Sequence, residues 1–470
     1  MSYLDSPLPR DHESWTSTLA VPLETLLSFM SYAVSITSSQ IERDRFGPPL
    51  SISDQSLIGL ACNIRREISS DSFTDAKLGS RLSGSYNLVH IIEFDDGFRF
   101  VIRVPGTGWG DRFTPSAKRC FVSQAFTMRF VRKETTISLP EVYACDPSSS
   151  NLIGAPYIAM SFIDGHPVSS KWNDTTGPTP KEERRLRILD TVAQAMAQLQ
   201  KFEFEMIGSL ESENGESESR IRVGPCYAYD DGDFGDDNYD QDLQVNESGP
   251  FDSSKSCLRH YTKYYKDHEK IRKDVVGLTT GPRALVDMII PSLPLSTKRA
   301  SSKHETFVLS LPDFGPQNVM VDEQGNLTGF IDWDEASTQP RWIGSISFPP
   351  WITRDWDPLM YNYPDSERED SPEELRRYRQ IYSRKMREML RGVGNWRFAN
   401  KAHIFEAACI AVCAEANQLE TLRKMVAKIC RVDDDEALQI IWDLGDGKLA
   451  SKEIDKLRKG FQLLLSVPRH

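Results

Sequence analysis

Three oxygen-bearing side chains, Asp313, Asn318 and Asp332, are spaced so that folding could bring them to one point. A short apolar segment follows Asn318, then a glycine-containing turn, and then a second apolar segment that ends just before Asp332. This pattern predicts a β-hairpin with strands at 319–321 and 327–331. Because a hairpin returns its second strand beside the start of its first, we expect Asn318 and Asp332 to lie side by side.

The oxygen atoms of Asn318 and Asp332 are hard ligands that suit Mg²⁺ carried by nucleotide phosphates. Asp313, on a predicted loop, can face the same point as a base or as a group that orients an acceptor hydroxyl. The D-x-x-x-x-N spacing alone occurs in many proteins. Coupled to the hairpin and to its Ile-Asp-Trp-Asp end, it is typical of the catalytic and metal loops of phosphoryl transfer. Asp334 could support the metal or face solvent.

The first group of elements that must position these residues is rich in strands. Segments 88–94 and 98–104 flank an Asp-Asp-Gly turn and predict a β-hairpin with one apolar face. A helix is expected around 123–133, with further strands at 139–144 and 157–162. Together they predict a small, mostly antiparallel sheet with one helix.

The rest of the chain is predominantly helical. Apolar residues recur at helical spacing over 181–204. Residues 371–374 (Ser-Pro-Glu-Glu) predict a helix start with a serine N-cap. We therefore expect a helical N-terminal extension (1–75), a β-rich lobe (76–165) with a hinge near 160–165, and a helical lobe (166–470).

Composition limits the class of protein. The chain has 470 residues, a formal charge of −12 and 39% hydrophobic residues, values typical of globular proteins. The net acidity argues against nucleic acid or a membrane surface as a partner. The apolar stretch 21–36 is too short to span a bilayer, and early acidic residues do not fit a signal peptide, so we expect a cytoplasmic location.

Two further features leave alternatives open. An acidic loop at 227–247 is predicted to be a solvated segment, or else an electrostatic funnel for a cationic substrate. The eight cysteines lack zinc-site spacing. Cys409 and Cys413, one helical turn apart, are predicted to be a buried, reduced pair, with a redox switch as the alternative. The sequence does not set an oligomeric state.

Segment 307–341 resembles the aminoglycoside phosphotransferase family, in particular its fungal branch. Residues 82–87 resemble the phosphate loop of that family, 100–104 the strand that follows, and 155–160 the hinge. The resemblance runs from roughly 80 to 390. It implies an α+β, bilobal protein-kinase-like fold, with a small antiparallel β-rich N-terminal lobe and a larger, mainly helical C-terminal lobe.

The resemblance also implies an ATP- and Mg²⁺-dependent phosphotransferase that acts on a hydroxyl of a small-molecule acceptor, with a cationic acceptor if the acidic loop is a funnel. Asp313 would be the catalytic base, and Asn318 and Asp332 would ligate Mg²⁺. The nucleotide would be held by the phosphate loop, by one strand cation and by the hinge, namely by Ser83, Gly84, Ser85, Arg103, Met160 and Phe162.

Three positions depart from the pattern of the family. Leu311 stands where a histidine is usual, Arg103 where a lysine is usual, and Gln124 where a glutamate is typical. Arginine keeps the charge but changes its reach and hydrogen-bond geometry, and a neutral glutamine cannot form an ion pair with it. The alternative function is therefore a catalytically impaired pseudokinase that acts as a ligand-binding or regulatory protein.

Overall fold

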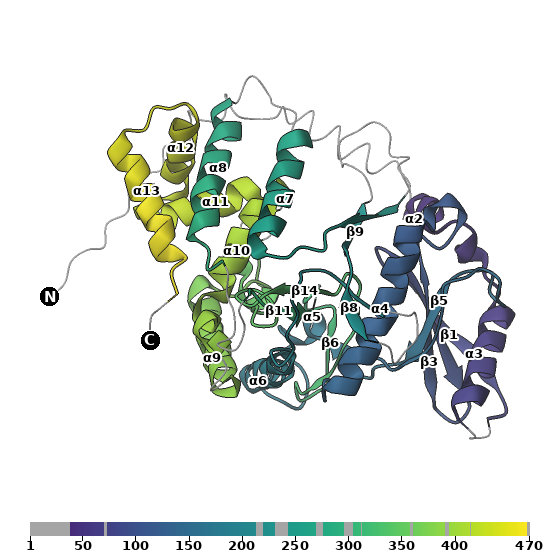
Figure 1. The fold of residues 1–470 in the computed structure, drawn as a ribbon. Helices are drawn as coiled ribbons and strands as arrows, with labels where there is room; N and C mark the ends of the chain where they lie inside the picture. The colour runs from purple at the N-terminus through teal and green to yellow at the C-terminus, as the bar shows by residue number, and fades with distance from the viewer. Residues whose placement is uncertain are drawn as a thin grey trace.

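A sheet-containing lobe and a larger, mainly helical lobe lie side by side in the computed structural model (Figure 1). Among the described residues, no helix is both long and apolar enough to cross a membrane. The structure describes residues 38–69, 73–212, 220–230, 243–268, 276–295, 304–311, 313–357, 361–390, 394–413 and 415–467.

The first lobe is built on a five-stranded antiparallel sheet with strand order β1-β2-β3-β5-β4. The predicted hairpin is β2 and β3, and its alternating residues Phe100, Ile102 and Val104 are fully buried. The elements of this lobe are α2 (Ser38–Phe46), η1 (Pro48–Ser51), α3 (Asp54–Ile68), β1 (Ala76–Ser83), β2 (Asn87–Phe94), β3 (Arg99–Pro105), η2 (Gly110–Arg112), α4 (Pro115–Glu134), β4 (Val142–Asp146) and β5 (Tyr157–Ser161).

Helices cover both faces of this sheet. Leu57 and Ile64 of α3 belong to one apolar cluster with Phe100 of β3. Phe121 of α4 and Met160 of β5 belong to a second cluster, which extends into the other lobe. The described part of the expected N-terminal extension therefore packs into the first lobe through α3, and its remaining residues, 1–37 and 70–72, lie outside the described residues.

Three helix or strand boundaries differ from those predicted from the sequence. Helix α4 begins at Pro115, well before 123, because Thr114 caps it by accepting a hydrogen bond of 3.2 Å from the Ala117 amide. Strand β4 begins after Pro140, which has no N–H to donate to a neighbouring strand. Helix α6 ends at Leu199, where the backbone turns back, and not at 204.

The second lobe combines short hairpins with a helical bundle around one large apolar core. Its elements are β6 (His166–Pro167), α5 (Val168–Lys171), α6 (Lys181–Leu199), β7 (Leu210–Ser212), β8 (Ile221–Val223), β9 (Cys226–Asp230), β10 (Gln244–Ser248), α7 (Ser254–His268), α8 (Val276–Ile289), η3 (Ile290–Ser292), β11 (Phe307–Ser310), β12 (Val319–Val321), β13 (Leu327–Phe330), β14 (Ser337–Pro340), η4 (Pro350–Ile352), η5 (Arg354–Trp356), α9 (Pro372–Met389), η6 (Gly394–Lys401), α10 (Ala402–Cys413), α11 (Glu415–Cys430), α12 (Asp434–Gly445) and α13 (Ser451–Leu464).

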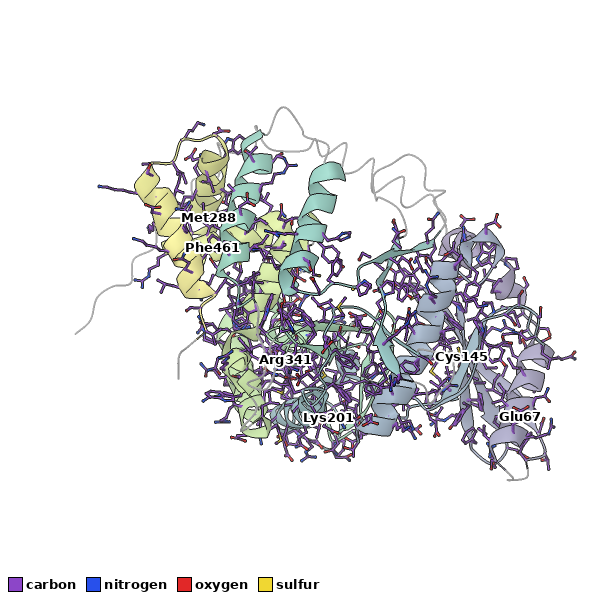
Figure 2. All side chains as sticks on the ribbon, in the orientation of Figure 1. Glu67, Cys145, Lys201, Met288, Arg341 and Phe461 are labelled. Carbon is purple, nitrogen blue, oxygen red and sulfur yellow. The ribbon has the colours of Figure 1, made fainter. Side chains whose placement is uncertain are left out.

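Two polar contacts fix parts of this lobe. The capping box predicted at the start of α9 is confirmed: Ser371 accepts from the Glu374 amide at 3.2 Å, and the Glu374 carboxylate accepts from the Ser371 amide at 3.0 Å. Arg341, labelled in Figure 2, is almost fully buried and donates to the Thr306 hydroxyl at 2.6 Å. This contact ties the end of β14 to the start of β11, just ahead of the loop that connects β11 to β12.

The segment predicted as an acidic loop contains the strand pair β9 and β10. Glu247 of β10 forms an ion pair with Arg119 of α4, so this strand pair contacts the first lobe. Residues 231–242, which carry most of the acidic side chains, lie outside the described residues. Cys409 and Cys413 lie half-buried on α10 as reduced thiols.

Candidate active site

The loop between β11 and β12 holds Asp313 and Asn318 against each other. Asn318 is 7% exposed, and its Nδ2 donates to Asp313 Oδ2 at 2.8 Å and to the Asp313 carbonyl at 3.1 Å. Gln317 Nε2 donates to the same Oδ2 atom at 2.9 Å. These bonds fix a solvent-exposed Asp313 carboxylate, while Phe314, Gly315 and Asn318 of the same loop are buried.

The β12–β13 hairpin brings Asn318 next to Asp332, as its spacing predicts. Val319 pairs with Phe330, and the Ile331 amide donates to the Asn318 carbonyl at 2.9 Å. The chain then turns sharply, because Asp332 has a φ of 62°. A left-handed conformation is costly for a residue other than glycine, by about 1–3 kcal/mol, and tends to occur at functional sites. The Asp332 side chain remains 40% exposed.

Arg103 of β3 reaches across from the first lobe and contacts two carboxylates. Its Nη1 lies 2.5 Å from Asp334 Oδ1 and 3.5 Å from Asp332 Oδ1. Asn87 Nδ2 donates to the other Asp334 oxygen at 2.7 Å. Asp334 is therefore buried between groups of the first lobe and does not face solvent, which was one of its two expected placements.

The charge of Asp332 depends on this environment. Although 40% of its side chain is exposed, the protein packed around its carboxylate and the neighbouring Asp334 charge raise the pKa of Asp332 to about 7, with Arg103 opposing the shift. Burial, together with the charges of Asp334 and Asp332, similarly raises the pKa of Glu335 to about 7. The site thus concentrates carboxylates beside one cation.

Gln124 of α4 is the helix residue that meets Arg103, as expected from its position. Arg103 Nη2 donates to Gln124 Oε1 at 2.8 Å, and Gln124 Nε2 in turn donates to the Tyr229 hydroxyl at 3.2 Å. Leu311 is 3% exposed and belongs to the apolar core of the second lobe. The loop between β11 and β12 is therefore anchored here by apolar packing, at the position where the aminoglycoside phosphotransferase family usually has a histidine.

Tyr229 and Glu335 belong to the site and were not found from the sequence. The Tyr229 ring stacks on Tyr86 with a centroid distance of 4.2 Å and an interplanar angle of 8°. The backbone amide of Tyr229 donates to Glu335 Oε1 at 2.7 Å. The alternation Tyr227-Ala228-Tyr229 is a strand signal, but it does not reveal which residues of the other lobe the strand will meet.

The predicted phosphate loop is the exposed turn between β1 and β2. The Gly84 amide donates to the Asn87 carbonyl at 2.9 Å, which closes the turn. The Ser83 hydroxyl donates to Glu42 of α2, and the Ser85 carbonyl accepts from Arg45 Nη1 at 2.7 Å. Helix α2 therefore supports this turn from behind.

The predicted hinge lies on and just after β5. Met160 is 6% exposed and pairs with Val101 of β3 and Val142 of β4. Phe162 is half-buried, and the Arg99 guanidinium lies 4.0 Å from its ring centroid. The structure thus gathers Asp313, Asn318, Asp332 and Arg103 at one site. Met160 lies on β5, the strand adjacent to β3, and Phe162 comes directly after β5.

A sheet lobe joined to a helical lobe, with this loop and hairpin at their junction, defines a kinase-like bilobal fold. The sequence profile described as "Phosphotransferase enzyme family" matches residues 81–378. The chain belongs to this family.

Curated relatives come from fungi. The chain is 22% identical over 420 residues to "Altered inheritance of mitochondria protein 9, mitochondrial" of Clavispora lusitaniae, which covers 80% of this chain and 66% of that protein. It is 23% identical over 316 residues to the protein of the same name from Lodderomyces elongisporus, which covers 59% of this chain and 48% of that protein. The chain thus spans about half to two thirds of the length of these relatives. The expected cytoplasmic location is wrong, because both relatives are named as mitochondrial proteins.

Two solved structures were also matched. Macrolide 2'-phosphotransferase MphH from Brachybacterium faecium is 11% identical, with 88% of this chain and 99% of that chain covered and a TM-score of 0.39. A thermostable mutant of aminoglycoside phosphotransferase APH(4)-Ia, in a ternary complex with AMP-PNP and hygromycin B, is 16% identical, with 83% and 98% covered and a TM-score of 0.39.

Proposed function

We propose that this protein transfers the γ-phosphoryl group of ATP, as its Mg²⁺ complex, to a hydroxyl of a small molecule. The observation that carries the proposal is one hydrogen-bonded arrangement. Asp313 is bonded to Asn318 at 2.8 Å, and Asn318 is bonded at 2.9 Å to the residue that precedes Asp332. A base, a metal-binding amide and a metal-binding carboxylate at one point are the parts that phosphoryl transfer needs.

The donor atoms at the hairpin fit Mg²⁺. The Asn318 amide nitrogen donates to Asp313, so the amide oxygen is the atom left to act as a ligand. The half-exposed Asp332 carboxylate stands beside it and supplies a second hard oxygen. Asn318 and Asp332 would hold Mg²⁺, which would supply positive charge to stabilise the phosphate group during transfer.

The proposed base is Asp313. Its Oδ2 atom is held by Gln317 and Asn318, which fixes the carboxylate while leaving it exposed to an incoming hydroxyl. In that position Asp313 would orient the acceptor and take its proton as the oxygen attacks the γ-phosphorus.

The proposed nucleotide contacts lie in the first lobe. Arg103 would pair with the phosphates, and the turn Ser83-Gly84-Ser85 would cover them. Gly84 lies outside the left-handed region, and a Cβ added to it would meet only the Asn87 carbonyl, at 3.5 Å. The fold of the protein alone therefore does not require glycine here, which supports a close approach by a ligand. Backbone groups from Met160 to Phe162 would hold the adenine.

A ligand-binding pseudokinase is the second candidate, and Arg103 is the observation that favours it. The Arg103 residue is 6% exposed, and its guanidinium lies 2.5 Å from Asp334 and meets a neutral Gln124 on the helix. A cation already paired in this way must be released from Asp334 before it can bind a phosphate. The two candidates differ in whether ATP is consumed.

The test is ADP release from ATP and Mg²⁺ with a panel of hydroxyl-bearing small molecules. We expect one or more acceptors to give turnover, and Asp313→Asn to lower kcat by about 10²- to 10⁴-fold, the usual effect of losing a general base. Asp365→Asn, at an exposed carboxylate outside the site, is the matched control. Turnover unchanged in Asp313→Asn would refute the role of Asp313, and ATP binding with no turnover on any acceptor would favour the pseudokinase.

A further inference from the structure

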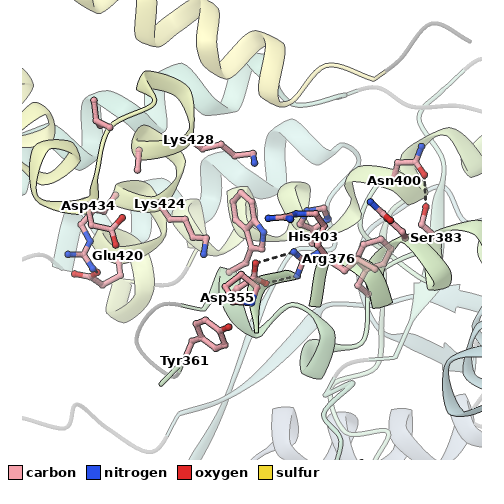
Figure 3. A pocket seen from close by; sticks show the side chains of 18 of the residues that line it. Asp355, Tyr361, Arg376, Ser383, Asn400, His403, Glu420, Lys424, Lys428 and Asp434 are labelled. Atoms are coloured by element: carbon pink, nitrogen blue, oxygen red, sulfur yellow. Dashed lines mark hydrogen bonds and ion pairs between the residues drawn. The ribbon is translucent and has the colours of Figure 1, made fainter. Parts of the chain in front are cut away.

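A cavity separate from the candidate active site opens in the helical lobe. It measures about 990 Å³ and is lined by residues of η5, α9, α10 and α11 (Figure 3). None of the proposed catalytic, metal or nucleotide residues lines it. Helices α9 and α11 lie on the side of the second lobe away from the five-stranded sheet (Figure 1). The volume of the cavity is at the upper end of the 300–1,000 Å³ usual for small-molecule sites.

The lining of this cavity is strongly basic. Seven arginine and lysine side chains face three carboxylates, although the whole chain carries a formal charge of −12. Two of the three carboxylates already have a cation. Asp355 accepts two hydrogen bonds from Arg379, at 2.5 and 3.0 Å, and Glu420 lies 2.5 Å from Arg423.

The remaining charges do not balance. Arg376 lies 3.8 Å from Glu373, which does not line the cavity. Among the described residues that line the cavity, four cations are left facing Asp434 alone, namely Arg384, Arg387, Lys424 and Lys428. Arg384, Arg387 and Lys428 are exposed, whereas Lys424 is half-buried. Burial lowers the pKa of Lys424 despite the nearby carboxylates of Asp355 and Asp434. An anion in the cavity would relieve this repulsion between like charges.

The inner wall of the cavity is aromatic and holds the lysines in place. The Lys424 and Lys428 ammonium groups lie 5.5 and 5.7 Å from the Trp356 ring centroid. His403 packs edge-to-face on the same indole at 5.4 Å and stacks on Phe348 at 5.4 Å. In the described part of the chain its buried Nδ1 has no hydrogen-bond partner. Figure 3 shows the lysines and His403 gathered around the cavity.

We propose that this basic cavity binds a small molecule that carries two or more phosphate groups, at a site distinct from the ATP site. Guanidinium groups match phosphate oxygens in a fork geometry, and a cavity that combines arginines of α9 with lysines of α11 favours more than one phosphate. A dicarboxylate or tricarboxylate shares the charge but not the tetrahedral array of acceptors, so citrate serves as the probe for charge alone.

The test is calorimetric titration of the full chain with inorganic pyrophosphate, inorganic phosphate and citrate, in EDTA so that metal-dependent binding at the ATP site is excluded. We expect pyrophosphate to bind at least tenfold more tightly than phosphate or citrate. Lys424→Gln/Lys428→Gln should weaken pyrophosphate at least tenfold. Lys452→Gln/Lys456→Gln, an exposed pair with the same spacing on α13, should leave the affinity unchanged.

Further variants keep the proposal testable. Arg387→Gln, at an exposed position on α9, should weaken pyrophosphate binding severalfold. This variant replaces the double lysine variant in the test if the latter does not fold. Asp332→Asn should leave metal-free pyrophosphate binding intact. The absence of pyrophosphate binding, equal affinity in wild type and in both pocket variants, or loss of binding in Asp332→Asn would overturn the proposal. Citrate binding as tight as pyrophosphate would overturn the preference for phosphate.

Discussion

Asn87 of the sheet lobe donates a hydrogen bond of 2.7 Å to Asp334 of the helical lobe. Both residues are buried, and the same Asp334 carboxylate pairs with Arg103. The two lobes are therefore tied together at the candidate active site by polar contacts between residues far apart in the sequence. Any change that weakens this junction should affect both stability and nucleotide binding.

Asn87→Ala should destabilise the protein. The change leaves an oxygen of the buried Asp334 carboxylate without its donor, and an unsatisfied buried polar group costs about 1–3 kcal/mol. Urea unfolding followed by circular dichroism measures the difference. Asn63→Ala, at an exposed position on α3, should change the free energy of unfolding by less than about 0.5 kcal/mol. Equal stability of Asn87→Ala and wild type would show that the lobe junction does not depend on this bond.

Gln124→Glu should raise the affinity for Mg²⁺-ATP by about fivefold. The new carboxylate would face Arg103 Nη2, now 2.8 Å from the Gln124 oxygen, and a charge-assisted bond is about 1 kcal/mol stronger than a neutral one. Arg103 would then be held by the helix and released from Asp334. Calorimetry measures the change, with Gln194→Glu on the exposed face of α6 as the control. A weaker affinity would mean that Arg103 does not contact the nucleotide.

Leu311→His should destabilise the protein even though it restores the residue usual in the resembling family. Leu311 is 3% exposed in an apolar core, and an imidazole buried there without a partner costs about 1–3 kcal/mol. Leu311→Met keeps the volume and should cost less than about 1.5 kcal/mol. Thermal unfolding of both variants distinguishes the two cases. A Leu311→His variant as stable as wild type would show that a polar partner for the histidine exists in the loop.

His90 should make the protein less stable as the pH falls from about 6.5 to about 4. This residue of β2 is 2% exposed, and burial, assisted by the Arg81 charge, lowers its pKa from 6.5 to about 4. In that range the unfolded chain binds a proton and the folded protein does not, so unfolding is favoured by up to about 3 kcal/mol. Above pH 6.5 both states are neutral and the effect vanishes.

The measurement is the free energy of unfolding of His90→Gln against wild type at several pH values. The difference in stability between pH 7 and pH 4.5 should be smaller in the variant. His260→Gln, at an exposed ring, should keep the wild-type dependence. The same pH dependence in His90→Gln and wild type would contradict the assignment.

The parts of the site that local rules determine could be predicted from the sequence. A short turn between two apolar segments fixes the register of a hairpin, and this rule is sufficient to place Asn318 beside Asp332. The two-lobed arrangement could be predicted because apolar residues alternate in the first part of the chain and recur at helical spacing from residue 181 onward. The start of α4 was missed because its signal is the Thr114-Pro115 cap and not periodicity.

The remaining parts depend on contacts between segments far apart in the chain. The pairing of Arg103 with Asp334, and the stacking of Tyr229 on Tyr86, are set by how the lobes pack. The basic cavity gathers Arg387 and Lys424 from separate helices. The negative net charge of the whole chain does not reveal this local cluster of basic residues.

The most direct test of the proposed function is calorimetric titration with ATP in the presence and absence of Mg²⁺, on wild type, Asp332→Asn and the surface control Asp365→Asn. We predict that Mg²⁺ strengthens ATP binding at least tenfold in wild type and in Asp365→Asn, and that Asp332→Asn loses this metal dependence. Equal ATP affinity with and without Mg²⁺ in wild type, or no ATP binding, would contradict the account.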